Sequence, residues 1–194
     1  MNGVAPFIEN KAVKNMNVSV SSAQRAEFNR LKLQSIAINK PKVVVVITRL
    51  DTKWHNASAE ESALRFKELI ETLHKVSPES KILILDQPPV CHFGNQNAVQ
   101  WLGMRNKYHR SDTANNLDPE GWQKGNKFVR ELPQLYTYVN FVPVSDIYLD
   151  VNRRVKLVEK NNIIYIDDDH LSEFGASLAE TRIQTAIEQI FKVK

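Results

Sequence analysis

The sequence predicts an α/β protein, a three-layer α/β/α sandwich around a mainly parallel sheet. Two observations lead to this prediction. The runs 42–48 and 81–85 are short and consecutively apolar, which is typical of strands buried on both faces in parallel sheets. A segment with helical periodicity separates them, and this strand–helix–strand order is the βαβ unit from which parallel sheets are built.

The length and composition are those of one globular domain. The chain has 194 residues, of which 42% are hydrophobic and 25% charged, with a net charge of +4. We expect an irregular segment over 1–20 and a single domain over 21–194. No apolar run approaches the roughly 18 residues of a membrane span, and the residues from Met1 to Val4 lack the basic and apolar regions of a signal peptide, so we expect the chain as given to be soluble. Its basic residues are scattered, which argues against a nucleic-acid partner.

The scarcity of glycine and cysteine excludes several kinds of site. The six glycines include no dinucleotide or Walker spacing, so no phosphate loop and no cofactor are expected. Cys91 is the only cysteine, which excludes an internal disulfide, and we expect it to be a buried thiol. Neither HExxH nor GxSxG occurs, so two common hydrolase signatures are absent.

The first half of the chain contains the proposed βαβ unit. A capping box begins a helix over 21–38, and the β-branched strand 42–48 follows it. A second capping box begins a helix over 58–76, and the strand 81–85 comes next. This order predicts that the two strands are parallel neighbours.

The second half begins with a polar stretch, 90–119, that we expect to be a long loop. The pattern then predicts a helix over 119–132, a strand over 138–142 and a short strand over 163–166. The last element is an amphipathic helix that begins at Ser172. Chemistry is expected in the loops that follow the strands, because ligands of open α/β sheets bind beyond the carboxyl ends of the strands.

The most informative of these loops carries Asp167 and His170 directly after the strand 163–166. The Asp-x-x-His spacing can place the carboxylate of Asp167 against one ring nitrogen of His170, leaving the imidazole as a general base worth roughly 10²–10⁴ in rate. In one alternative, the three aspartates 167–169 only cap the final helix. In another, they bind a divalent metal with His170, although no second cluster of acids or histidines accompanies them, and we predict no metal.

The block Tyr-Ile-Asp-Asp-Asp-His-Leu-Ser-x-x-Gly-Ala, residues 165–176, resembles the closing block of the SGNH (GDSL-type) hydrolases, and specifically of SGNH domains fused to membrane acyltransferase family 3 proteins. The resemblance covers about residues 36–192. It implies that Asp167 and His170 complete a catalytic triad with a serine. It also implies an extracytoplasmic, membrane-associated O-acyltransferase or esterase, coupled to an integral membrane acyltransferase domain, that acts on acyl (acetyl) esters of carbohydrate hydroxyls.

The chain departs from the family pattern at its nucleophile. No serine follows a strand in a Gly-Asp-Ser block, so we expect the chain either to start after the first strand of the fold or to be a pseudoenzyme. Arg49 occupies the region of a family asparagine that serves the oxyanion, and it could contact substrate or pair with Asp51. Alone, the chain is expected to be poorly active. The competing interpretation is a non-catalytic SGNH-fold module that binds a glycan or a partner protein.

Overall fold

The computed structural model describes residues 22–48, 59–91, 98–106, 113–114, 119–167 and 170–192. Two compact units divide the chain. The first contains residues of 1–85 and 124–141, and the second contains residues of 86–123 and 142–194. The segment 1–20, expected to be irregular, lies outside the described residues.

The first unit is built on a three-stranded sheet in the order β1-β2-β4. β1 and β2 are parallel, with Val44 opposite Ile82. On the other side of β2, the N–H of Ile82 donates to the carbonyl of Tyr138 at 2.8 Å. The predicted α/β fold with a parallel sheet is therefore confirmed. The strands are β1 (Val43–Val46), β2 (Lys81–Leu85) and β4 (Val139–Val142).

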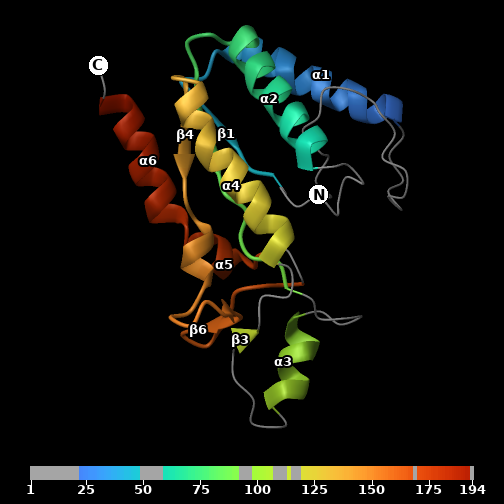
Figure 1. Ribbon diagram of the computed structural model, residues 1–194, viewed down its shortest axis with the longest axis vertical. Helices are drawn as coiled ribbons and strands as arrows, with labels where there is room; N and C mark the ends of the chain where they lie inside the picture. The colour runs from blue at the N-terminus through green and yellow to red at the C-terminus, as the bar shows by residue number, and fades with distance from the viewer. Residues whose placement is uncertain are drawn as a thin grey trace. The chain divides into compact units, whose positions relative to one another are not determined.

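Three helices accompany this sheet, and α1 and α2 lie side by side (Figure 1). Leu69 and Leu73 of α2 pack in one apolar cluster with Val129 of α4 and with Ile82 and Ile84 of β2. Burying each such side chain stabilises the fold by about 1.5–3 kcal/mol. The helices are α1 (Ser22–Asn39), α2 (Ala59–Val76) and α4 (Pro119–Leu135), each close to its predicted range.

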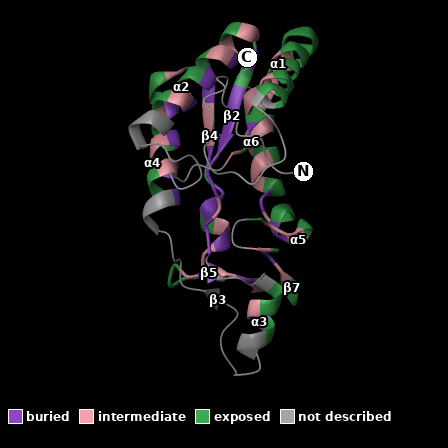
Figure 2. Ribbon diagram, turned by 90° about the vertical axis from the view of Figure 1, so that its right-hand side faces the viewer, coloured by how far each residue is buried: buried purple, intermediate pink, exposed green. Residues whose placement is uncertain are grey.

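β1 differs from the prediction that it is buried on both faces. Val45 is 40% exposed and Ile47, just after the strand, is 73% exposed, whereas Ile82 and Leu83 of β2 are fully buried. Figure 2 shows β2 in the purple of buried residues. The reason is position: within the described part of the chain, β2 is the only strand that pairs with β1. An apolar run therefore forms the edge of the sheet.

The second unit has its own apolar cluster, which includes Tyr148, Leu157, Ile164, Tyr165 and Cys91. Cys91 is fully buried, as predicted. A helix, α3, stands within the stretch that was expected to be a loop. The elements are α3 (Ala98–Asn106), β3 (Thr113–Ala114), the 3-10 turn η2 (Ser145–Tyr148), β5 (Val155–Lys156), β6 (Val158–Glu159), β7 (Asn162–Ile163), α5 (Glu173–Ser177) and α6 (Glu180–Lys192).

The short strand predicted over 163–166 is found only in part, because β7 ends at Ile163 and Tyr165 forms an isolated bridge with Leu171. β7 pairs antiparallel with β6 in a two-stranded hairpin. The two turn residues, Lys160 and Asn161, have φ angles of 51° and 63°. Positive φ at both central residues is the signature of a type I′ turn, whose twist suits a tight hairpin. Local turn geometry therefore determines the pairing of this segment.

The final helix begins where the sequence predicts but is divided into α5 and α6. Ser172 is the N-cap residue, and its Oγ accepts a hydrogen bond from the N–H of Gly175 at 2.9 Å. The carbonyl of Ala176 then accepts from the N–H of Ala179, a tight turn that separates the two helices.

Candidate active site

Asp167 and His170 are in direct contact. Nδ1 of His170 lies 2.9 Å from both carboxylate oxygens of Asp167, and the backbone N–H of His170 donates to Asp167 Oδ1 at 2.8 Å. The carboxylate therefore holds both the ring and the backbone of the histidine. With Nδ1 against the carboxylate, Nε2 is the ring nitrogen that would act as a base in a triad of this kind.

A short loop closure supports this pair. Tyr165 and Leu171 form an isolated antiparallel bridge, and the N–H of Ile166 donates to the carbonyl of His170 at 2.8 Å. The N–H of Ser172 donates to the carbonyl of Ile164 at 2.8 Å, which fixes the start of α5 behind the loop. The positions of both functional side chains are thus set by backbone contacts within nine residues of chain.

The alternative in which the aspartates only cap the final helix does not apply to Asp167. The N-cap of α5 is Ser172, and Asp167 uses its oxygens on His170. Residues 168 and 169 lie outside the described residues. No group of three metal-ligating side chains occurs in the part of the chain that the structure describes.

The pair is open to solvent, with 62% of the His170 side chain and 39% of the Asp167 side chain exposed. More than half of the His170 side chain is therefore in contact with solvent. Arg49, the predicted substrate-binding residue, lies outside the described residues, and its place relative to His170 stays a prediction.

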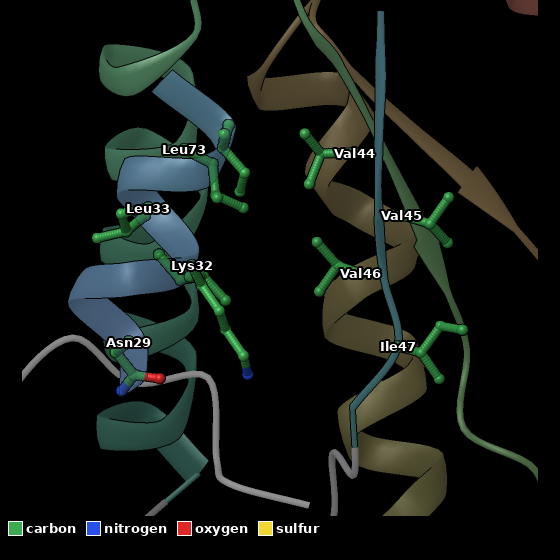
Figure 3. Close-up of a pocket in the computed structure, with 10 residues that line it drawn as sticks. Asn29, Lys32, Leu33, Val44, Val45, Val46, Ile47 and Leu73 are labelled. Carbon is green, nitrogen blue, oxygen red and sulfur yellow. The ribbon is translucent and has the colours of Figure 1, made fainter. Parts of the chain in front are cut away.

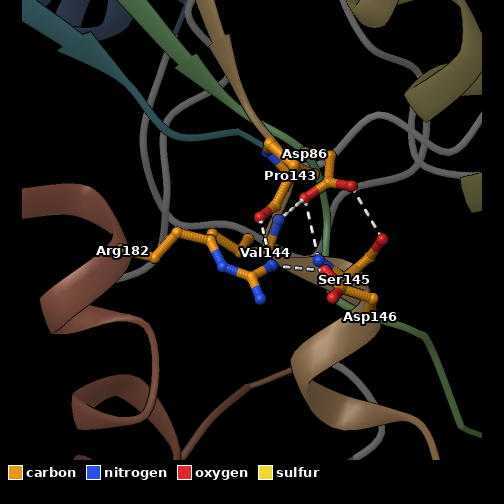
Figure 4. Close-up of polar contacts among 6 residues, drawn as sticks. All are labelled: Asp86, Pro143, Val144, Ser145, Asp146 and Arg182. Carbon is orange, nitrogen blue, oxygen red and sulfur yellow. Dashed lines mark hydrogen bonds and ion pairs between the residues drawn. The ribbon is translucent and has the colours of Figure 1, made fainter. Parts of the chain in front are cut away.

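The sequence analysis did not identify a second polar cluster, which is formed by Asp86 and Ser145 (Figure 4). Asp86 directly follows β2, and Ser145 comes shortly after the end of β4. Asp86 is 2% exposed and Ser145 is 8% exposed. The carboxylate of Asp86 accepts from the N–H of Val144, from the N–H of Ser145 at 2.9 Å and from Ser145 Oγ at 2.7 Å. Donors to three lone pairs compensate for burial of the charge, so this cluster fixes the loop that starts η2. The sequence feature that could have revealed this cluster is the position of Asp86, an acid directly after the buried strand β2.

The same loop is held from the other side by Arg182 of α6 (Figure 4). Its Nη1 donates to the carbonyl of Pro143 at 2.7 Å and to Asp146 Oδ1 at 2.5 Å. The Asp146 side chain is 64% exposed, so the ion pair contributes little by itself, about 1 kcal/mol at most.

Replacing Asp86 tests its structural role. Asp86→Ala leaves two backbone N–H groups without their acceptor, and we expect a loss of about 3 kcal/mol in the free energy of unfolding. Urea denaturation followed by circular dichroism measures the loss. Asp146→Ala, a neighbouring acid in an exposed ion pair, is the matched control and should cost under about 1 kcal/mol. Equal losses for the two variants would contradict the assignment.

A buried tyrosine supports α5 from the core. Burial, with a smaller effect of the Asp86 charge, raises the pKa of Tyr148 to about 12. Its hydroxyl therefore stays protonated and donates to the carbonyl of Gly175 at 3.1 Å. An added Cβ on Gly175 would lie 2.1 Å from the backbone oxygen of Ile164, so only glycine permits this approach of α5 to the strand segment.

An α/β fold with an Asp–His pair just before a helix is an arrangement suited to acyl-transfer chemistry through a nucleophile and a base. The family comparison is more specific. Residues 1–185 match the model of the SGNH domain that is fused to AT3 domains, and the chain belongs to this family.

Two solved structures share the fold. One is the periplasmic domain of a lipopolysaccharide acetyltransferase from Salmonella ser. Paratyphi A, with a TM-score of 0.73 and 15% identity over 94% of this chain and 68% of that chain. The other is a putative platelet activating factor from Streptococcus pneumonia, with a TM-score of 0.55 and 18% identity over 79% of this chain and 67% of that chain. No curated protein matches the sequence. None of the described helices combines the length and apolarity that a bilayer crossing requires.

Proposed function

We propose that this chain is the SGNH domain of a membrane-associated O-acyltransferase that places an acyl group, acetyl above all, on a carbohydrate hydroxyl at the extracytoplasmic side of a membrane. The observation that carries the proposal is the contact between Asp167 and His170 Nδ1, at 2.9 Å from each carboxylate oxygen. In the proposed mechanism Asp167 orients the ring through Nδ1, and Nε2 is the catalytic base.

In the proposed reaction, the nucleophile is a serine hydroxyl outside this chain. His170 Nε2 takes the hydroxyl proton as the oxygen attacks the acyl carbonyl of the donor, and returns it to the departing donor group, which leaves an acyl-serine. An acceptor hydroxyl then attacks the acyl-serine and loses its proton to His170, and the released serine regains a proton. Asp167 stabilises the imidazolium in both steps.

Two further findings support this proposal. The family model describes SGNH domains fused to AT3 domains, which provides a membrane acyltransferase partner in the same polypeptide. The structural neighbour from Salmonella is the periplasmic domain of a lipopolysaccharide acetyltransferase. At 15% identity the likeness shows only the fold, so the acceptor class is an extension by analogy.

The proposal is tested with Asp167→Asn in the complete acyltransferase. The amide cannot hold the imidazole in the required tautomer or stabilise its charge, and we expect acyl transfer to fall roughly tenfold or more. Transfer of a radiolabelled acetyl group to membrane glycan measures the effect.

The control is Asp150→Asn. Asp150 is an acid of the same unit, and its carboxylate pairs with Nη2 of Arg154 at 2.8 Å. Activity within twofold of wild type is expected for it. Equal activity of Asp167→Asn and wild type would reject the catalytic role and favour a non-catalytic, glycan-binding domain.

A further inference from the structure

The backbone pairing around the Asp167–His170 loop also fixes the place of Ile166. Tyr165 and Leu171 form an antiparallel bridge, and one position closer to the loop the N–H of Ile166 donates to the carbonyl of His170 at 2.8 Å. Ile166 and His170 are therefore directly opposite each other. Residues in this relation have side chains on the same face, with Cβ atoms about 4.5–5.5 Å apart. The side chain of Ile166 thus lies beside the imidazole.

This face is the solvent face of the closure. Because side chains alternate along an extended segment, Ile166 lies on the opposite face from Tyr165. Tyr165 is fully buried in the apolar cluster of the second unit, and its hydroxyl donates to the carbonyl of Pro89 at 3.0 Å. Ile166, in contrast, is 55% exposed. It therefore presents an aliphatic surface to solvent next to His170.

The exposure of Ile166 differs in origin from that of the aliphatic residues at the sheet edge. Val45 and Ile47 stand beside a pocket of about 260 Å³ and point away from α1 and α2 (Figure 3). They are exposed because β1 has a strand partner on only one side among the residues that the structure describes. Ile166 instead directly precedes Asp167, whose carboxylate lies 2.9 Å from Nδ1 of His170. Its exposed side chain is thus fixed next to the proposed catalytic pair.

The acyl group of the proposed reaction starts close to this side chain. When Nε2 of His170 takes the proton of the serine hydroxyl, the two atoms lie at hydrogen-bond distance, about 2.6–3.2 Å. In the acyl-serine the acyl carbon is bonded to that same oxygen, so the acyl chain begins beside the imidazole. An aliphatic side chain on this face offers the acyl chain a contact that removes apolar surface of both groups from water.

We propose that Ile166 is a specificity-determining residue whose side chain contacts the methyl and methylene groups of the acyl chain. The inference rests on the proposed function, because it takes His170 as the base and a serine as the acyl carrier. Ile166 forms a surface along which the acyl chain lies, so each methylene that reaches it strengthens binding by up to about fourfold. The contact therefore distinguishes acyl groups by their apolar length.

The first test uses the chain as it is, labelled with ¹³C. We expect a nuclear Overhauser effect between the methyl protons of Ile166 and the ring protons of His170, because directly opposite side chains on one face are in contact. This measurement does not depend on the reaction. Absence of the effect would remove the placement of Ile166 and overturn the inference, whatever the activity of the complete protein.

The second test compares p-nitrophenyl acetate with p-nitrophenyl butyrate as acyl donors for the complete acyltransferase, with release of p-nitrophenolate as the measurement. For Ile166→Ala we expect kcat/KM to fall about four- to tenfold with the butyrate and about twofold with the acetate, because butyryl carries two more methylenes. A merely structural role would lower both values equally. Ile166→Leu, which keeps the number of carbon atoms, should hold the ratio of the two values within about twofold of wild type.

Val151→Ala is the matched control. Val151 is an aliphatic residue of the same unit, 97% exposed in a turn, and its replacement should leave the ratio of butyrate to acetate unchanged. A ratio that is unchanged or raised in Ile166→Ala would contradict the acyl contact.

His170→Ala separates this inference from the proposed function. If it loses activity with both esters while Ile166→Ala lowers both equally, the acyl contact is wrong and the proposed function stands. Wild-type activity of His170→Ala would overturn both.

Discussion

His170→Ala is expected to lower acyl transfer by the acyltransferase proposed above roughly 10²–10⁴-fold, because it removes the side chain that we propose as the general base. The folded state should survive. The His170 side chain is 62% exposed and its loss opens no cavity in the core. Rates of labelled acetyl transfer to membrane glycan measure the first expectation, and thermal melting of the isolated chain measures the second.

The matched comparison is His170→Gln, which retains a polar side chain of similar length but cannot accept a proton near neutral pH. It should be as inactive as the alanine variant if proton transfer is the role of the residue. Wild-type rates in either variant would exclude His170 as the base. A large fall in melting temperature together with lost activity would indicate instead that the residue is structural.

Gly175→Ala is expected to have the largest effect on stability. The new Cβ would lie 2.1 Å from the backbone oxygen of Ile164 and 3.2 Å from that residue's Cγ2, and a backbone atom cannot rotate away. α5 must shift, which also breaks the hydrogen bond from Tyr148 Oη at 3.1 Å. We expect a cost of about 3–5 kcal/mol in the free energy of unfolding, measured by urea denaturation.

Gly103→Ala is the control for this prediction. Gly103 also lies in a helix, but a Cβ there meets nothing within 4 Å. Alanine in a helix is favoured over glycine by about 1 kcal/mol, so this variant should be neutral or slightly more stable. If both variants lost stability equally, the close approach of α5 would not be the cause.

The main helices and strands could be predicted from the sequence because the spacing of apolar residues indicates which face of an element is buried. The helix 59–76 and the strand 81–85 follow directly from their patterns, and the parallel pairing of β1 with β2 follows from their order. The same reasoning failed for the burial of β1. An apolar composition indicates that a strand is stabilised by burial on both faces, but it does not show whether a neighbouring strand covers it.

The remaining features were missed for two physical reasons. One depends on the backbone conformation of two turn residues, and the other on a contact between residues far apart in the sequence. The hairpin of β6 and β7 depends on positive φ at Lys160 and Asn161, a pair without the glycine that usually marks such turns. The contact of Asp86 with Ser145 joins residues 59 positions apart, which no spacing rule detects. The contact of Asp167 with His170 was predictable because the two residues are only three positions apart.

That short separation has a consequence for assembly. The carboxylate, the imidazole and the backbone bond from Ile166 to His170 all belong to one stretch of five residues, so the pair forms as soon as this loop closes. Closing so small a loop costs little entropy and needs no distant partner. The Asp167–His170 pair is therefore assembled within its own segment, and in the proposed mechanism the nucleophile would meet an imidazole that is already oriented for proton transfer.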